Sequence, residues 1–136
     1  MMRPLDEKTL AAQRQVAPDD LPAIAAAGVT LVVNNRPDGE EEGQPSSAEI
    51  EAAARAAGLD YRHIPIAGGF NMDDVLAMAD ALDAAEGKVL AFCRTGTRST
   101  FLWALAQSER GEPADRVAAA ADAAGYDLAP IRSYLS

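Results

Sequence analysis

The only cysteine of the chain lies in a stretch that could attack an anionic substrate. The apolar run Val89–Phe92 leads directly into Cys93, a short polar loop then closes on Arg98, and a helix-forming segment follows. This order predicts a buried strand that delivers a thiol to the N-terminus of a helix. Backbone N–H groups and the helix dipole at that place favour negative charge and lower the pKa of a thiol. We therefore expect Cys93 to act as a thiolate nucleophile.

The residues after the cysteine are of the types that an anion-binding loop needs. A glycine permits a tight turn that points successive N–H groups inward. Arg98 offers a two-pronged guanidinium suited to a tetrahedral oxyanion, and Ser99 could donate a hydrogen bond to the thiolate. We predict Cys93 and Arg98 as catalytic residues, and as substrate-binding residues the rest of the loop, Arg94, Thr95, Gly96, Thr97 and Ser99. The simpler alternative is a buried, inert cysteine beside an exposed arginine.

Strand-like and helix-like segments alternate along the chain and predict the scaffold of this loop. Apolar or alternating runs over 29–33, 59–66 and 88–92 predict strands, and a further short strand is expected near 13–17. Helix signals cover 18–28, 46–57, 71–86, 99–108, 113–124 and 128–135. Ser46 and Asn71 are the expected N-caps of the second and third of these helices, and Pro113 is expected at a first helical position. The pattern predicts an α/β fold in which helices flank a mostly parallel sheet of four to five strands.

A second polar turn is expected at the same edge of this sheet. Asn34–Gly39 follows a predicted strand, and ligands of parallel sheets bind at the carboxyl ends of the strands. We therefore add Arg36 as a substrate contact or, alternatively, as an ion-pair partner of Glu40 or Glu41. The acidic cluster at 40–42 is otherwise interpreted as a solvated loop.

Composition and charge narrow the classes of function. The 136 residues correspond to one domain, 1–136, with a hydrophobic content of 49%. A net charge of −9 disfavours nucleic acid and anionic membranes as partners. No apolar run is long enough to span a bilayer and the N-terminus has no secretory pattern, so together with a single free cysteine we expect a cytoplasmic location. Nothing in the pattern calls for a metal or an organic cofactor, and it leaves the oligomeric state open.

Two groups of enzymes resemble the cysteine loop. It is similar to the cysteine-dependent phosphatases, in which a thiolate attacks phosphorus, and to the rhodaneses, in which the thiolate carries a sulfur atom. Phosphatases of the tyrosine and dual-specificity type have a histidine where Phe92 stands and one more residue between the cysteine and the arginine. The shorter loop, considered alone, resembles the rhodanese type. The segment Tyr61–Ile66 and the helical pattern after residue 99 resemble the phosphatases instead.

Three motifs in this order resemble one bacterial family in particular. They are Asn34–Glu41, His63–Pro65 and Cys93–Ser99, and the resemblance covers about residues 5–135. The family is the phosphatase-like domain of beta-lactamase hydrolase-like proteins, also described as sulfur transferases. This resemblance implies a tyrosine-phosphatase-like fold of the cysteine-phosphatase superfamily.

The resemblance implies a mechanism with a general acid, and this chain lacks the residue that usually takes that role. Dual-specificity phosphatases carry an acidic residue shortly after the Ile-Pro strand, where this chain has Ala67–Gly69. We predict Asp38 as the general acid and Asp73 as the second choice, although Asp38 could simply be a turn residue and Asp73 part of a helix start. We interpret the single histidine, His63, as structural and Trp103 as a core residue.

Three functions follow in order of preference. The first is hydrolysis of a phosphomonoester, on a small anionic molecule or a phosphoprotein, through a phosphocysteine at Cys93. The second is rhodanese-like sulfur transfer through a Cys93 persulfide, which needs no general acid. The third is an anion-binding or interaction module with little catalytic activity.

Overall fold

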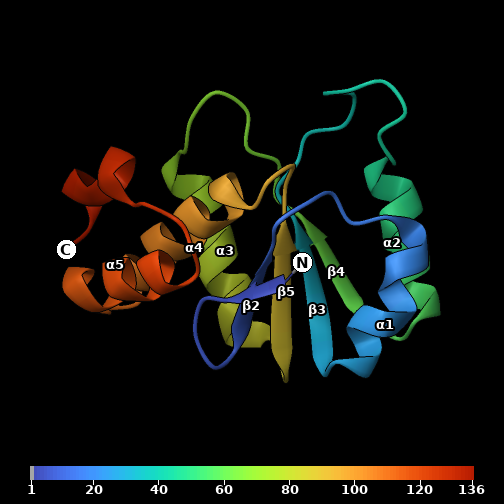
Figure 1. The fold of residues 1–136 in the computed structure, drawn as a ribbon, viewed down its shortest axis with the longest axis horizontal. Helices are drawn as coiled ribbons and strands as arrows, with labels where there is room; N and C mark the ends of the chain where they lie inside the picture. The colour runs from blue at the N-terminus through green and yellow to red at the C-terminus, as the bar shows by residue number, and fades with distance from the viewer. Residues whose placement is uncertain (1) are drawn as a thin grey trace.

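The computed structural model describes residues 2–136 and contains one five-stranded sheet with helices on both faces (Figure 1). The strands run in the spatial order β1-β2-β5-β3-β4. Their bounds are β1 Met2–Pro4, β2 Thr9–Ala12, β3 Val29–Asn34, β4 Asp60–His63 and β5 Lys88–Phe92. Only the edge pair β1–β2 is antiparallel, so the expected mostly parallel sheet is confirmed.

The helices divide between the two faces of the sheet, as Figure 1 shows. One face carries η1 Pro18–Asp20, α1 Leu21–Ala26 and α2 Ser47–Ala56. The other carries α3 Met72–Ala84, α4 Thr97–Glu109, α5 Ala114–Ala123 and η2 Ala129–Tyr134. The expected N-caps are confirmed, because Ser46 and Asn71 accept hydrogen bonds from the third residue of α2 and α3 respectively.

Strand residues alternate between two separate cores. Leu31 and Val33 pack under α3–α5, whereas Val32, between them, packs under α1 and α2. The central strand β5 alternates in the same way, and all of its residues after Lys88 are buried. Burial of both faces explains why β3 and β5 are continuous apolar runs. Trp103 of α4 is 1% exposed, so its expected place in the core is confirmed.

The N-terminal strand prediction was wrong in position. No strand covers 13–17 within residues 2–136, and the chain instead forms a hairpin of β1 and β2. Thr9–Ala12 is short and alanine-rich, so its local preference for a strand is weak, and its parallel pairing with β5 decides its conformation. The boundary at Pro113 also differs, because this residue is the N-cap of α5 rather than its first helical position. The final helix is a 3-10 helix.

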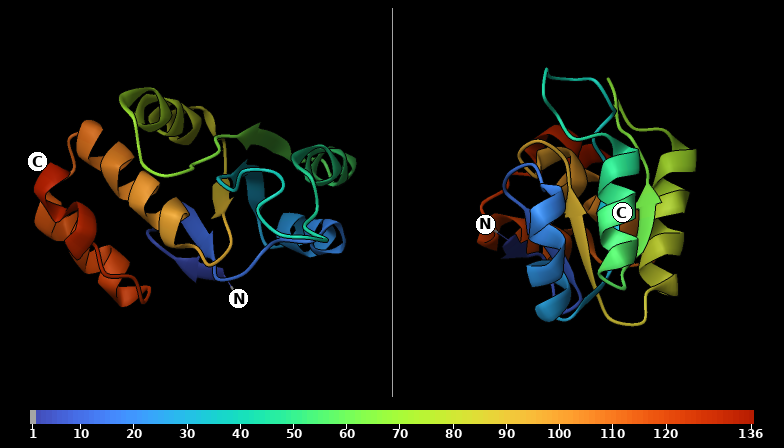
Figure 2. Two further views of the ribbon diagram at one scale, coloured as in Figure 1. Left: turned by 90° about the horizontal axis from the view of Figure 1, so that it is seen from above. Right: turned by 90° about the vertical axis from the view of Figure 1, so that its right-hand side faces the viewer.

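Loops from three parallel strands meet at the upper edge of the sheet in Figure 1. Asn35 N–H donates to Phe92 O, and Ile66 N–H donates to Asn35 O, at 2.8 and 2.9 Å. These bonds tie the segments after β3 and β4 to the end of β5. Seen from above in Figure 2, the loop after β3 reaches over the sheet edge toward the beginning of α4.

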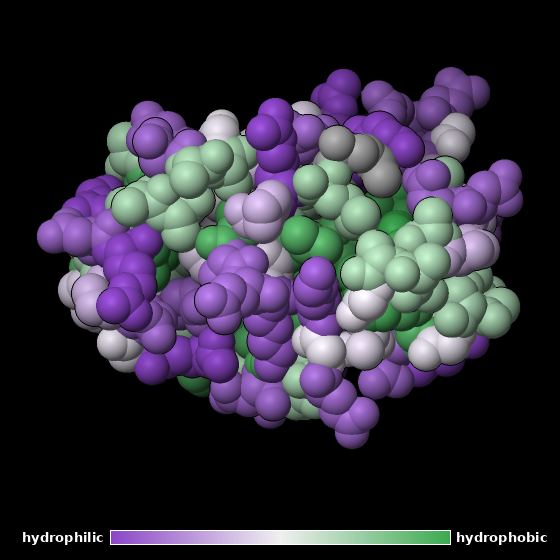
Figure 3. Space-filling model, turned by 60° about the horizontal axis from the view of Figure 1, so that its bottom comes forward, coloured by the Kyte–Doolittle hydropathy of each residue, from purple (hydrophilic) through white to green (hydrophobic). Residues whose placement is uncertain are grey.

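The surface is mixed in polarity. The face drawn in Figure 3 has hydrophilic residues over much of its outer layer, and hydrophobic residues show in the hollows between them. No helix in the described part of the chain has the length and apolar character needed to cross a membrane.

Candidate active site

The Cys93 loop joins the central strand to the N-terminus of α4. The thiol is 1% exposed and lies directly after the buried end of β5. Gly96 is the N-cap of α4 and has a left-handed φ of 92°. Its N–H donates to Cys93 Sγ at 3.1 Å, so the loop directs a backbone N–H group at the sulfur. A strand followed by a glycine turn and a helix therefore produces the expected loop around the thiol. We call this loop, residues 93–99, the cradle.

The cradle favours the thiolate form of the cysteine. Burial raises the pKa of Cys93, but hydrogen bonds from the backbone N–H groups of Ser99, Thr95 and Gly96 outweigh this effect. The nearby Ser99 hydroxyl lowers the pKa further; it is buried and makes no hydrogen bond to any of the described residues. The net result is a thiol pKa below its ordinary value. Stabilised negative charge on sulfur is what a nucleophilic cysteine requires.

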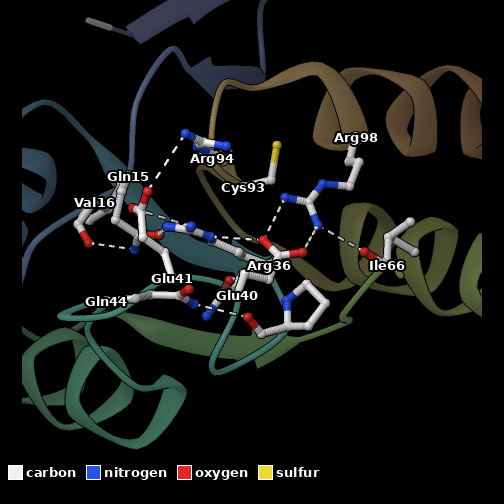
Figure 4. A network of polar contacts seen from close by, with 12 residues as sticks. Gln15, Val16, Arg36, Glu40, Glu41, Gln44, Ile66, Cys93, Arg94 and Arg98 are labelled. Atoms are coloured by element: carbon white, nitrogen blue, oxygen red, sulfur yellow. Dashed lines mark hydrogen bonds and ion pairs between the residues drawn. The ribbon is translucent and has the colours of Figure 1, made fainter. Parts of the chain in front are cut away.

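Arg98 lies beside the thiol and is held by a carboxylate from another loop (Figure 4). Its Nη1 and Nη2 donate to the two oxygens of Glu40 at 2.7 and 2.9 Å, and Nη1 also donates to Ile66 O at 3.0 Å. The pKa of Arg98 is raised by Glu40, against a lowering by burial, and the Cys93 thiolate raises it further. Arg98 thus connects the loops that follow three strands.

These contacts leave one edge of the Arg98 guanidinium available. The group has five N–H donors in a fixed planar arrangement. Glu40 takes the end formed by Nη1 and Nη2, and Ile66 O takes the other hydrogen of Nη1. The remaining donors are Nε–H and the second hydrogen of Nη2, which form the side edge. That edge can make the paired hydrogen bonds that a tetrahedral oxyanion accepts.

Arg36 lies behind Glu40 rather than at the surface of the cradle. Its side chain is 2% exposed, and Nε donates to Glu40 at 2.9 Å while Nη1 donates to Gln15 Oε1 at 2.8 Å. Glu41 lies 3.5 Å from Nη2. The alternative role of Arg36, as an ion-pair partner of the two glutamates, is confirmed. With its donors engaged in this way, Arg36 supports the site from behind, and this position disfavours the predicted direct contact with substrate.

Glu40 was expected at most as an ion-pair partner of Arg36, and its contact with Arg98 was not predicted. It accepts hydrogen bonds from both Arg98 and Arg36, and Arg98 lowers its pKa to about 2 despite the opposing effect of burial. A run of acidic residues in a loop normally indicates a solvated surface. For the contact with Arg98, 58 positions away, the sequence offered only the expectation that the two loops share one edge of the sheet.

The two predicted acids lie in different surroundings. Asp38 Oδ1 accepts a hydrogen bond from Ser47 N–H at 2.7 Å, at the beginning of α2. This contact fits the turn-residue alternative, and the side chain makes no hydrogen bond to the Cys93 loop among the described residues. Asp73 is exposed in the first turn of α3. His63 Nε2 lies 2.9 Å from Arg36 O, a contact that fits its structural interpretation.

Three other predicted loop residues, Arg94, Thr95 and Thr97, are exposed. Arg94 is 66% exposed and lies 3.6 Å from Glu41, so it adds positive charge at the rim. The hydroxyls of Thr95 and Thr97 lie 3.2 Å apart. Within residues 2–136 we find no cluster of three or more His, Cys, Asp or Glu side chains arranged to hold a metal ion.

The mostly parallel five-stranded sheet flanked by helices places the chain in the class of tyrosine-phosphatase-like α/β folds. The structure resembles Tk-PTP with a TM-score of 0.74 at 19% identity over 97% of this chain and 90% of that one. It also resembles a kinase-associated phosphatase with a TM-score of 0.71 at 15% identity, covering 93% and 81% of the two chains. At these identities the likeness shows the fold alone.

The family can be stated more narrowly. The sequence model described as "Beta-lactamase hydrolase-like protein, phosphatase-like domain" matches residues 2–110, and the chain belongs to this family. Beta-lactamase hydrolase-like proteins of Agrobacterium fabrum and Xylella fastidiosa are 40% and 37% identical over 76% and 98% of this chain. The chain spans only 24% and 32% of the length of those two relatives.

A solved structure is also similar in sequence. A candidate phosphatase from Neisseria meningitidis is 35% identical with a TM-score of 0.82, and the match covers 96% of this chain and 93% of that one. The expected membership of the phosphatase-like family is therefore confirmed.

Proposed function

We propose that the chain is a cysteine-dependent phosphatase-type hydrolase that acts on a phosphomonoester, either a small molecule or a phosphoprotein. The observation that carries the proposal is the cradle itself. A thiol of lowered pKa accepts a hydrogen bond from Gly96 N–H and lies beside Arg98, whose side edge makes no hydrogen bond within residues 2–136. Family membership and the candidate phosphatase of Neisseria support the same chemistry.

The proposed reaction has two displacements at phosphorus. The Cys93 thiolate attacks phosphorus, the bond to the ester oxygen breaks, and the alcohol leaves after gaining a proton. Water then attacks the phosphocysteine, which restores the thiolate and releases inorganic phosphate. Backbone N–H groups of the loop and the free edge of Arg98 bind the three non-bridging oxygens during both steps.

The leaving oxygen needs a proton donor. Glu40 is close to Arg98, but its pKa of about 2 keeps it ionised and unable to donate at neutral pH. We retain Asp38 as the proposed acid, because its loop lies at the correct edge of the sheet, and Asp73 as the competitor. Substrates with good leaving groups, such as aryl phosphates, need little help from an acid and are the substrates to test first.

A second candidate is sulfur transfer, and one observation favours it. Glu40 is ionised and Asp38 accepts from Ser47 N–H, so the described part of the chain offers no evident acid at the cradle. Sulfur transfer from thiosulfate needs none. The Cys93 thiolate attacks the outer sulfur, the sulfur–sulfur bond breaks, sulfite leaves, and the resulting persulfide passes its terminal sulfur to a nucleophile such as cyanide.

The decisive experiment measures both activities in parallel. Purified protein is assayed for phosphate release from an aryl phosphate and for sulfur transfer from thiosulfate to cyanide. The variants are Cys93→Ser and Arg98→Lys, with Arg62→Lys as a control because Arg62 pairs with Asp80 away from the cradle. We expect phosphate release that is abolished by Cys93→Ser, lowered about a hundredfold or more by Arg98→Lys and unchanged by Arg62→Lys.

Each other result has a definite meaning. Transfer of sulfur that depends on Cys93, without phosphate release, would replace the phosphatase proposal with the second candidate. Activity that survives Cys93→Ser in both assays would remove the catalytic role of the loop. If the purified protein shows neither activity while phosphate still protects Cys93 from alkylation, the chain is an anion-binding module.

The acid is tested by the leaving group. Asp38→Asn should slow hydrolysis of an alkyl phosphate at least tenfold more than hydrolysis of an aryl phosphate, because only the poor leaving group needs the proton. The asparagine oxygen can still accept from Ser47 N–H, so the fold is expected to persist. An equal effect on both substrates, or a larger selective effect of Asp73→Asn, would exclude Asp38.

A further inference from the structure

A tyrosine from the C-terminal segment contacts the cysteine loop. Tyr126 lies beyond the residues matched by the family and just after α5. Its hydroxyl donates to Thr95 O at 3.0 Å, and its own N–H donates to Ala121 O at 2.9 Å. The ring is therefore anchored by the end of α5 and reaches across to the active loop.

The hydrogen bond to Thr95 O acts on the peptide group that serves the thiol. Thr95 O and Gly96 N–H belong to the same planar peptide, so the direction of one determines the direction of the other. The oxygen accepts from Tyr126, and the N–H on the opposite side donates to Cys93 Sγ at 3.1 Å. A single side chain thus holds one of the loop's N–H groups toward the sulfur.

This peptide needs such a restraint because it precedes a glycine. Glycine adopts positive and negative φ almost equally well, so a peptide next to it can rotate at little cost. Tyr126 also packs directly on Gly96, since a Cβ at that position would lie 2.1 Å from the tyrosine hydroxyl. The tyrosine hydroxyl also interacts electrostatically with the thiolate. Burial raises the pKa of Tyr126, and the charge of the Cys93 thiolate raises it further.

We propose that Tyr126 is a positioning residue, which holds the Thr95–Gly96 peptide with its N–H directed at the Cys93 sulfur and at the oxyanion bound there. The inference rests on the proposed function in that it assumes a thiolate nucleophile. It adds a contribution from the C-terminal segment to a site otherwise built from the loops of the sheet.

The test is a titration of the single thiol in the whole chain. In Tyr126→Phe the ring stays and only the hydroxyl is removed. The control is Tyr134→Phe, because Tyr134 is 73% exposed and its hydroxyl has no hydrogen bond within residues 2–136. We expect Tyr126→Phe to raise the thiol pKa and to slow alkylation by iodoacetamide about two- to tenfold below that pKa, as the loss of one hydrogen bond to the loop implies. Tyr134→Phe should match the wild type.

A second readout separates positioning from general stability. The amide resonance of Gly96 should follow the titration of Cys93 in the wild type and follow it less closely in Tyr126→Phe. A variant that melts at a lower temperature but keeps the wild-type thiol pKa, alkylation rate and Gly96 titration would overturn the inference. The titration needs no substrate, so absent phosphate release would refute the proposed function without affecting this result.

Discussion

Removing the charge of Glu40 should destabilise the protein in a pH-dependent manner. Glu40→Gln preserves the size of the side chain and one acceptor oxygen, but it removes the carboxylate that joins Arg98 to Arg36. Arg36 is 2% exposed, so it keeps a buried charge whose nearest counter-ion has gone. Breaking one side of a buried or half-buried ion pair costs more than losing a surface pair, because the other charge remains desolvated.

The magnitude follows from the protonation of Glu40. Its pKa falls from 4.5 to about 2 in the folded state, and each unit corresponds to about 1.4 kcal/mol. The side chain is 30% exposed, so solvent screening reduces the unscreened value of about 3 kcal/mol to about 1–2 kcal/mol. Because the folded pKa is the lower one, this stability is fully present well above pH 4.5 and is lost as the pH falls toward 2.

Urea unfolding at several pH values measures this contribution. At pH 7 the free energy of unfolding of Glu40→Gln should lie about 1–2 kcal/mol below that of the wild type. By pH 3 roughly half or more of the difference should have disappeared. Glu42→Gln is the control, because Glu42 is exposed and makes no ion pair within the described residues. Equal stability of Glu40→Gln and the wild type at pH 7, or a difference that persists unchanged to pH 3, would refute the reasoning.

Three further predictions concern single positions. Gly96→Ala should destabilise the protein by about 2 kcal/mol or more and abolish activity, because φ is 92° and the new Cβ would lie 2.6 Å from Ala12 O. Chemical unfolding and the phosphate-release or sulfur-transfer assay check this, and stability near that of the wild type would contradict it. Ser99→Ala should raise the thiol pKa, because the hydroxyl lowers it, with little loss of stability, because this buried hydroxyl has no hydrogen-bond partner among the described residues. A thiol titration unchanged from the wild type would exclude the hydroxyl from the cradle. Asn71→Ala should cost about 1 kcal/mol through the lost cap of α3 and leave the titration of Cys93 unchanged, which thermal unfolding and alkylation kinetics together would show.

Local sequence patterns predicted most of the fold correctly. The continuous apolar runs of β3 and β5, the capping pairs of α2 and α3 and the glycine turn after Cys93 depend on neighbouring residues, and each appears where expected. A hydrogen bond between a cap and the third residue of its helix joins residues that are close in sequence, so the residue types at those positions are enough to predict it. The N-terminal hairpin was misplaced because β2 is specified by pairing with β5 rather than by its own residues.

The sequence by itself determined the chemical identity of the site: a single thiol, a glycine turn, an arginine and a helix start that follow a buried strand. Only the tertiary structure decided how these groups are charged and restrained. Glu40 reaches Arg98 across 58 positions, and Tyr126 reaches Thr95 across 31, because the sheet order and the packing of α5 bring their segments together. Such contacts depend on where whole elements lie in space, and no local pattern of residues records that.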